Sequence, residues 1–344
     1  MLQAKHIPDR EQAIDRLYCD AVAMLFDRRL AEPARRAMVQ AGAFVLEFVF
    51  ASEALAEIYL QSFLRIEPAE PDLRIAVLRK SDIDLSELVP SPRNQFRTHV
   101  SDASLVHWNP DRLPLLYVID RRQRRGFIWL AEDAAPEWEL SRPACPLIHA
   151  LTAETSHIIA HGGAVSLHGR CLLLAGKGRA GKTTAALACA RAGWHYAGDD
   201  YFFADTASGQ VLPLYSSARL RVDMEAVFAD ALTASRGRSR DDGDDRHELR
   251  LGRWLPPAQI SGGVIAAILL PRRNGELRPC FMPATPTEAF NALFLTTKLG
   301  LPGPIGWVAE KLTRLVALAP AYHVDTGSTP RDIPDAFAEF LAKR

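Results

Sequence analysis

The chain has 344 residues, a length that allows two domains and a sizeable hydrophobic core. Apolar residues make up 48% of it and charged residues 24%, as in an ordinary soluble globular protein. Because 41 basic side chains balance 41 acidic ones, the formal net charge is zero, which argues against bulk electrostatic attraction to nucleic acid or to an anionic membrane.

Other features of the sequence predict a cytoplasmic protein. The longest apolar run, residues 264–271, is too short to cross a bilayer. The first six residues carry no apolar segment behind their basic side chains, so no secretory signal is apparent. The five cysteines lie far apart without a C-x-x-C pair, which predicts reduced and mostly buried thiols. No nucleic-acid or membrane partner is expected, and self-association into a homo-oligomer stays open.

The first 145 residues are predicted to form a small α+β domain whose role the sequence does not reveal. Apolar residues with helical spacing predict a helix over residues 8–40, and a short helix is expected over residues 53–64. The expected strands cover residues 44–50, 73–78, 105–108, 115–119 and 126–130. The basic run 121–125 is interpreted as a solvated hairpin tip, with a phosphate or peptide site as the alternative. Nothing in this part resembles a catalytic constellation.

The proline-rich stretch from Pro143 to Pro146 is predicted to separate this domain from a second one, residues 146–344. A helix is expected over residues 146–160. Strands are expected over residues 170–175, 195–203 and 265–270. The densely charged segment 235–250 is interpreted as an exposed, mobile loop, with a substrate lid as the alternative. Near the end, Thr329 and Pro330 are expected to open a final helix.

Residues 176–183 read G-K-G-R-A-G-K-T, a complete G-x-x-x-x-G-K-[ST] phosphate-binding loop. The glycines let the backbone bend so that successive N–H groups point at phosphate oxygens. Lys182 can reach the β- and γ-phosphates, and the Thr183 hydroxyl can ligate Mg²⁺. An apolar strand precedes the loop and a helix over residues 183–192 follows it, so the helix N-terminus adds partial positive charge to the anion site. The predicted nucleotide-binding residues are Gly176, Lys177, Gly178, Arg179, Ala180, Gly181, Lys182, Thr183 and Thr184.

A phosphate loop alone does not separate kinases from GTPases and transport ATPases. A GTPase is expected to carry an N-K-x-D guanine-binding motif, which this sequence lacks. Residues 260–264 are faintly similar to the signature of transporter ATPases, but the apolar strand beyond them ends in Pro271-Arg272-Arg273 and not in an acidic pair. Both classes are therefore disfavoured.

The informative acids are Asp199 and Asp200, at the end of the short segment 195–197. In a parallel α/β domain, a strand beside the loop strand delivers its C-terminal end to the nucleotide. Two adjacent carboxylates there suit two tasks, since one can accept the proton of an attacking hydroxyl and the other can hold Mg²⁺ directly or through water. The alternative is an ordinary turn with an aspartate cap.

Together with the loop, residues 161–176 and 193–200 resemble the kinase domain of HPr kinase/phosphorylase. That family phosphorylates a serine on a small carrier protein, and its fold is related to phosphoenolpyruvate carboxykinase. Its pattern places a histidine at the offset that His161 has from Gly176, and an Asp-Asp pair at the offset seen here from Lys182.

The resemblance implies an α/β P-loop kinase domain of this kind, preceded by the smaller N-terminal α+β domain. The implied roles are phosphate binding by Lys182, Mg²⁺ ligation by Thr183 with support from Asp200, proton acceptance by Asp199, and an active-site role for His161. The family's glutamate–arginine signature has no clear counterpart here. Arg219 occupies that region and can contact phosphate, but the glutamate role is unfilled, so reverse phosphorolysis stays in question. The first 145 residues do not resemble the family's regulatory domain.

The whole chain is more similar to divergent HPr-kinase-like bacterial proteins, some of which resemble serine kinases acting on ribosomal peptide precursors. The sequence therefore predicts an ATP- and Mg²⁺-dependent kinase that transfers the γ-phosphoryl group to a serine or threonine hydroxyl of a protein or peptide. A small-molecule kinase and a non-catalytic ATP-binding sensor or scaffold are the alternatives.

Overall fold

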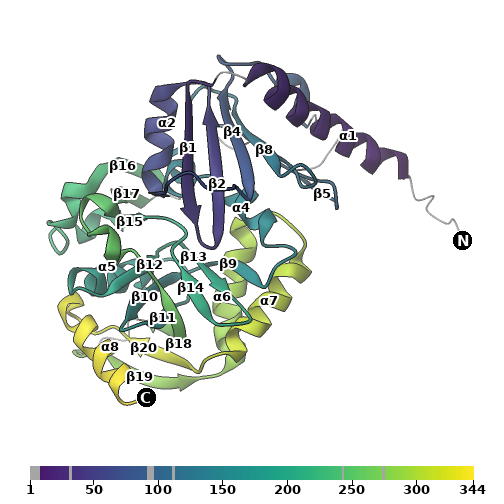
Figure 1. Ribbon diagram of the computed structural model, residues 1–344. Coiled ribbons are helices and arrows are strands. Elements are labelled where there is room, and N and C mark those ends of the chain that lie inside the picture. Colours follow the sequence, from purple (N-terminus) through teal and green to yellow (C-terminus); the bar gives the residue numbers. More distant parts are fainter. Residues whose placement is uncertain (1–7, 31–32, 91–96, 111–112, 242–243, 273–275) are drawn as a thin grey trace, which may run out of the picture.

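The chain folds as a mixed α/β protein built on three sheets in its described part (Figure 1). This computed structural model describes the chain except residues 1–7, 31–32, 91–96, 111–112, 242–243 and 273–275. Its helices are α1 (Pro8–Met24), α2 (Glu53–Tyr59), α3 (Glu137–Ser141), α4 (Cys145–Leu151), α5 (Lys182–Arg191), α6 (Pro286–Gly300), α7 (Ile305–Ala317) and α8 (Ile333–Ala342).

The first sheet comes entirely from the N-terminal part of the chain. Its eight strands are β1 (Arg35–Ala41), β2 (Phe44–Phe50), β3 (Leu64–Arg65), β4 (Leu73–Arg79), β5 (Thr98–Val100), β6 (Ser104–Asn109), β7 (Leu115–Asp120) and β8 (Arg125–Leu130). They run in the order β3-β1-β2-β4-β8-β7-β6-β5, with β4 parallel to both β2 and β8 and the other pairs antiparallel.

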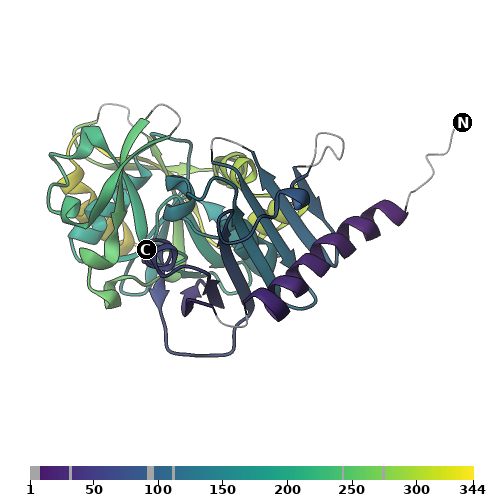
Figure 2. The ribbon, with the colours of Figure 1, turned by 90° about the horizontal axis from the view of Figure 1, so that it is seen from above.

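Both faces of the first sheet are covered. Along β7, Leu116 and Val118 face α1, whose helix lies across that side of the sheet in Figure 2. The alternate residues Leu115, Tyr117 and Ile119 belong to the core on the opposite face. This period of two places apolar side chains on both sides, as expected for a strand buried on both faces.

The second sheet comes from the C-terminal part. Its nine strands are β9 (His157–His161), β10 (Gly163–Leu167), β11 (Arg170–Leu174), β12 (His195–Gly198), β13 (Tyr201–Asp205), β14 (Gln210–Leu212), β18 (Gly263–Arg272), β19 (Cys280–Ala284) and β20 (Ala321–Asp325). The main order is β12-β10-β11-β18-β14-β13-β9, and β20 joins β18 to β19. Helices α5 and α8 cover one face and α6 and α7 the other.

A third, three-stranded sheet lies over the start of α5 and consists of β15 (Ser217–Arg221), β17 (Asp244–Arg250) and β16 (Ser235–Asp241), in that order. Leu220 and Leu249 from this sheet enter the same core as α5. The sheet thereby brings β15 and β17 close to the phosphate loop.

One hydrophobic core joins the two halves of the chain. It contains residues of the first sheet together with Tyr201, Phe203 and Tyr215 from the second half. Phe44, next to the β1–β2 turn, packs edge-on against Phe203 with ring centroids 5.5 Å apart. Gly42 in that turn has φ +61°, and a Cβ there would lie 2.3 Å from the Phe203 ring, so the close approach requires glycine. The two halves are therefore packed through a shared apolar interior.

Several predicted elements differ from those observed. The helix predicted over residues 8–40 is wrong beyond Met24, because a short π-helix follows (Leu25–Arg29) and the chain then enters β1, which pairs with β2 over seven residues. The helix predicted over residues 146–160 ends at Leu151, since β9 follows and pairs with β13. The strand predicted over 195–203 is broken at the acidic pair into β12 and β13.

Other predictions are confirmed. The run 121–125 forms the tip of the β7–β8 hairpin, with Asp120 paired to Arg125. The described chain contains no disulfide, and Cys145, Cys171 and Cys189 are buried. The final helix is present, although Thr329 makes no side-chain cap and Pro330 opens a 3₁₀ turn before α8. Among the described helices, none has the length and apolar character needed to cross a membrane.

Candidate active site

The phosphate loop connects the end of β11 to the start of α5. Gly176 and Gly181 have φ values of +147° and +103°, and Arg179 also adopts a positive φ of +67°, so the loop uses the backbone freedom that its glycines supply. Gly181 precedes α5 without a side-chain cap, which leaves N–H groups of the first turn available to an anion. The Lys182 ammonium is 2.7 Å from the Gly176 carbonyl and 3.1 Å from that of Lys177.

A cavity of about 320 Å³ opens on this loop, and we call it the loop cavity. Loop residues from Gly178 to Thr184 form one side of it. The other sides include His161 from the end of β9, Asp200, Arg219 from β15 and Arg246 from β17. The cavity thus gathers basic groups and a carboxylate around the start of α5.

The acidic pair reaches the loop by a route that differs from the predicted one. Strand β12 does not lie beside β11, because β10 separates them and pairs antiparallel with both. Two antiparallel steps restore the direction, so β12 and β11 both end at the edge where α5 begins. The Thr183 hydroxyl is 2.8 and 3.0 Å from the two carboxylate oxygens of Asp199. The sheet therefore brings the acids to the loop despite being largely antiparallel.

The backbone at the acidic pair is tightly constrained. Asp200 has φ +64°, an uncommon conformation for a residue other than glycine. Its carbonyl accepts a hydrogen bond from Gly162 N–H at 3.0 Å, which ties it to the end of β9. A Cβ on Gly198 would lie 2.6 Å from the Tyr201 carbonyl, so this turn admits only glycine there. The strained turn aims the Asp199 side chain at Thr183 and leaves Asp200 on the cavity wall.

Burial and neighbouring charges give the two carboxylates different pKa values. Asp199 is 5% exposed, and burial together with the neighbouring Asp200 raises its pKa to about 6. Burial also disfavours ionisation of Asp200, but Arg219 and Arg142 outweigh it and lower that pKa to about 2. Burial lowers the pKa of Lys182, an effect opposed by the two aspartates. Asp200 therefore carries the more firmly held negative charge.

His161 lies at the junction of β9 with the acidic pair. Burial lowers its pKa to about 4 despite the nearby Asp200, so the imidazole is neutral at pH 7. Its backbone N–H donates to the Thr297 hydroxyl at 2.8 Å, and its ring meets Tyr201 edge-on with centroids 5.6 Å apart. Within the described residues its buried Nδ1 has no hydrogen-bond partner.

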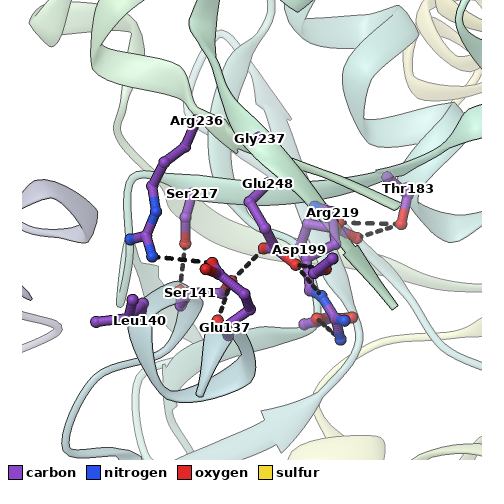
Figure 3. A network of polar contacts seen from close by, with 12 residues as sticks. Glu137, Leu140, Ser141, Thr183, Asp199, Ser217, Arg219, Arg236, Gly237 and Glu248 are labelled. Atoms are coloured by element: carbon purple, nitrogen blue, oxygen red, sulfur yellow. Dashed lines mark hydrogen bonds and ion pairs between the residues drawn. The ribbon is translucent and has the colours of Figure 1, made fainter. Parts of the chain in front are cut away.

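Arg219 connects the acidic pair to a buried glutamate. Its Nε donates to Glu248 at 3.0 Å, and its Nη1 lies 3.7 Å from the Asp200 carboxylate. Glu248 sits directly opposite Arg219 in the β15–β17 pair and is 5% exposed. The hydroxyls of Ser141 and Ser239 also donate to Glu248. Figure 3 shows this network running from Thr183 through Asp199 and Arg219 to Glu248 and Ser141.

The prediction of an exposed, mobile loop over residues 235–250 is wrong. The described residues of this segment form β16 and β17, and charged side chains such as Arg236 and Glu248 have ion-pair partners elsewhere in the fold; residues 242–243 lie outside the described part of the chain. Sequence reasoning therefore missed Arg246, which lines the loop cavity, and Glu248. The signal that could have revealed them is the period of two in which Arg246, Glu248 and Arg250 alternate with His247 and Leu249.

Most of the residues predicted from the sequence line the loop cavity: Gly178 to Thr184, His161, Asp200 and Arg219. Asp199 is hydrogen-bonded to Thr183, which lines the cavity. Gly176 and Lys177 lie beside it, where their carbonyls hold Lys182. Comparison of the chain with known protein families and with curated proteins finds no match.

Proposed function

We propose that the protein is a kinase that uses ATP and Mg²⁺ to phosphorylate a serine or threonine hydroxyl of a protein or peptide. The proposal rests chiefly on one observation. The Thr183 hydroxyl of a complete phosphate loop hydrogen-bonds to Asp199, while the adjacent Asp200 lines the same cavity. This arrangement joins a triphosphate-binding element to carboxylates that can serve phosphoryl transfer.

The loop cavity suits a triphosphate by its charge. Arg179, Lys182, Arg219 and Arg246 all line it, and the N–H groups at the start of α5 add to the positive potential. Lys182 would exchange its contacts with the loop carbonyls for phosphate oxygens. Arg219 and Arg246 line the same cavity and would stabilise charge on the transferred group, as arginines do in phosphoryl-transfer enzymes.

The oxygen groups in this cavity fit Mg²⁺. Mg²⁺ is usually held by one or two carboxylates together with substrate phosphates and water, and Thr183 and Asp200 supply such oxygens. In the described part of the chain, no group of three His, Cys, Asp or Glu residues could hold a metal alone, so phosphate and water would complete the coordination. When bound, Mg²⁺ neutralises charge on the phosphates.

In the proposed reaction the acceptor oxygen forms a bond to the γ-phosphorus as the bond to the β-phosphate oxygen breaks, and ADP leaves. The hydroxyl proton passes to a carboxylate of the pair. We assign that role to Asp199 and metal support to Asp200, following the resemblance to HPr kinases. The reverse division also has an observation in its favour, because Asp199 is held by Thr183 whereas Asp200 faces the cavity.

The test measures transfer from γ-labelled ATP to a peptide, a phosphocarrier protein and free serine. Asp199→Asn is expected to keep nucleotide binding and lose on the order of 10²–10⁴-fold in kcat, without a change in the Mg²⁺ concentration that gives half-maximal rate. Asp200→Asn is expected to raise that Mg²⁺ concentration. The opposite pattern would assign the base to Asp200, and full activity of both variants would remove the pair from the mechanism.

Asp205→Asn is the matched control, since Asp205 ends β13 outside the lining of the loop cavity and bonds to Ser156 and to its own turn at Ala207 and Ser208. Labelling of free serine alone would favour a small-molecule kinase. Tight ATP binding without any labelled product would favour the sensor or scaffold alternative.

A further inference from the structure

A second and larger cavity lies between the first sheet and the second half of the chain. It has a volume of about 1140 Å³, and we call it the interdomain cavity. The edge strand β5 and the neighbouring β6 form one wall, through residues such as Thr98, Val100 and Trp108. Helix α3 and the end of α6 contribute the opposite side, with Trp138 and Lys298.

The interdomain cavity adjoins the loop cavity at Arg219. Arg219 lines both cavities. Arg142 and Tyr201 line the interdomain cavity beside it, and the Arg142 guanidinium stacks over the Tyr201 ring at 5.4 Å. Asp200 directly precedes Tyr201 and lines the loop cavity. A group that reached inward from the interdomain cavity would therefore arrive at Arg219, whose guanidinium lies 3.7 Å from the Asp200 carboxylate.

The walls of the interdomain cavity are basic and aromatic. Arg97, Arg142 and Lys298 line it, and none of the described carboxylates forms an ion pair with Lys298. The lining carboxylate of Glu137 is already paired with Arg236 at 2.9 Å. The site thus favours an occupant that carries negative charge close to apolar or aromatic surface.

The edge strand suits an extended occupant. Trp108 N–H donates to the Arg97 carbonyl and Ser101 N–H donates to the Ser104 carbonyl. The backbone groups of the odd-numbered residues from 97 to 101 therefore face β6. By the alternation of antiparallel pairs, the backbone groups of Thr98 and Val100 point to the outer edge. Their side chains also share the face that lines the cavity. An extended peptide can pair with such an edge through main-chain hydrogen bonds.

We propose that the interdomain cavity binds the phosphoryl acceptor as an extended peptide segment in which acidic residues flank the reacting hydroxyl. This inference rests on the proposed kinase function. The cavity is about 1140 Å³ in volume and is bordered by the edge strand β5, so it has room for an extended segment that pairs with that strand. The first domain would then serve acceptor recognition, as the wall that faces the phosphoryl-transfer residues.

The test uses the full chain, γ-labelled ATP with Mg²⁺, and an array of serine peptides flanked by Glu, Ala or Lys. We expect kcat/KM for Glu-flanked peptides to exceed that for Ala-flanked peptides on the order of tenfold. Lys298→Glu is expected to bring that ratio close to one, and Lys298→Gln to give an intermediate ratio. Lys80→Glu is the matched control, since Lys80 is exposed on the first domain away from both cavities, and is expected to keep the preference.

Equal rates for acidic, neutral and basic peptides would overturn the inference, as would an acidic preference that survives unchanged in Lys298→Glu. ATP binding is measured in parallel, so that failure of the acceptor assignment can be told apart from failure of the proposed kinase function. A chain that labels peptides equally whatever their flanking charge contradicts the acceptor assignment alone, whereas a chain that binds ATP but labels no peptide, or labels only free serine, contradicts the proposed function with it. A chain that fails to bind ATP contradicts the proposed function as well.

Discussion

Glu139, in α3 at the junction of the two halves, is fully buried among polar partners. The hydroxyls of Tyr59 and Tyr117 donate to its carboxylate, the latter at 2.5 Å, and Ala144 N–H donates at 2.9 Å. Burial raises its pKa from 4.5 to about 7, an effect that these hydrogen bonds and Arg142 only partly offset. We expect this one carboxyl group to make the folding free energy depend on pH.

The direction follows from proton counting. Between pH 4.5 and about 7 the folded chain keeps the Glu139 proton while the unfolded chain has lost it. The folded state then binds one proton more, so this contribution to stability falls as pH rises. At 1.36 kcal/mol per pH unit, the gap between 4.5 and about 7 corresponds to about 3 kcal/mol.

Buried histidines act in the opposite direction and would mask this effect in the wild-type protein. Burial lowers the pKa of His107, His149 and His161 to about 4, so the unfolded chain binds more protons between pH 4 and 6.5 and their contribution rises with pH. The informative quantity is therefore the difference between wild type and Glu139→Gln, in which the histidine terms cancel.

Urea unfolding followed by tryptophan fluorescence, at constant ionic strength from pH 4.5 to 8, gives that difference. The stability of wild type relative to Glu139→Gln is expected to fall by about 3 kcal/mol across the range and to level off above pH 7. Glu57→Gln on α2, which is exposed, controls for the loss of one carboxylate. A difference that stays constant across this pH range would refute the reasoning.

The remaining predictions concern the site and the thiols. Saturating ATP and Mg²⁺, at a hundred times the dissociation constant, should stabilise wild type by about 2.7 kcal/mol in thermal unfolding, and Lys182→Met should lose that gain. Glu248→Ala should destabilise the chain by about 3 kcal/mol in urea unfolding, because it strips the buried Arg219 of a partner, whereas Glu248→Gln should cost less. In the native chain, thiol reagents should modify the partly exposed Cys280 first, because burial and Asp120 raise the pKa of the Cys19 thiol to about 12; reaction of a buried thiol before unfolding would contradict this.

The parts of the site that follow from local sequence were predictable. The glycines of the loop from Gly176 to Thr183 permit the backbone conformation that it adopts, and the alanines and leucines that follow favour a helix. The acidic pair reaches the loop for a reason that the sequence did not reveal, because β10 intervenes between β12 and β11 and two reversals restore the direction.

The elements that depend on distant partners were not predictable in the same way. Residues 35–41 continue an apolar spacing compatible with helix, and only pairing with β2 and β3 makes them a strand. The segment 235–250 has the composition of a solvated loop. Only the folded structure shows that Glu248 lies opposite Arg219 and accepts a hydrogen bond from the Ser141 hydroxyl. A charged strand of this kind is stabilised by residues far away in the chain, so a short stretch of sequence cannot predict it.

The apolar interior shared by the two halves limits how this protein can move. Domains that touch through a small polar surface commonly swing about a hinge, as many kinases do when they close on substrate. Here such a swing would pull Phe44 away from Phe203 and expose a continuous core to water. Conformational change in this protein is therefore expected to come from local rearrangement of loops and side chains. By the same logic, a chain cut before residue 146 would leave Phe203 and Tyr215 uncovered and prone to aggregate.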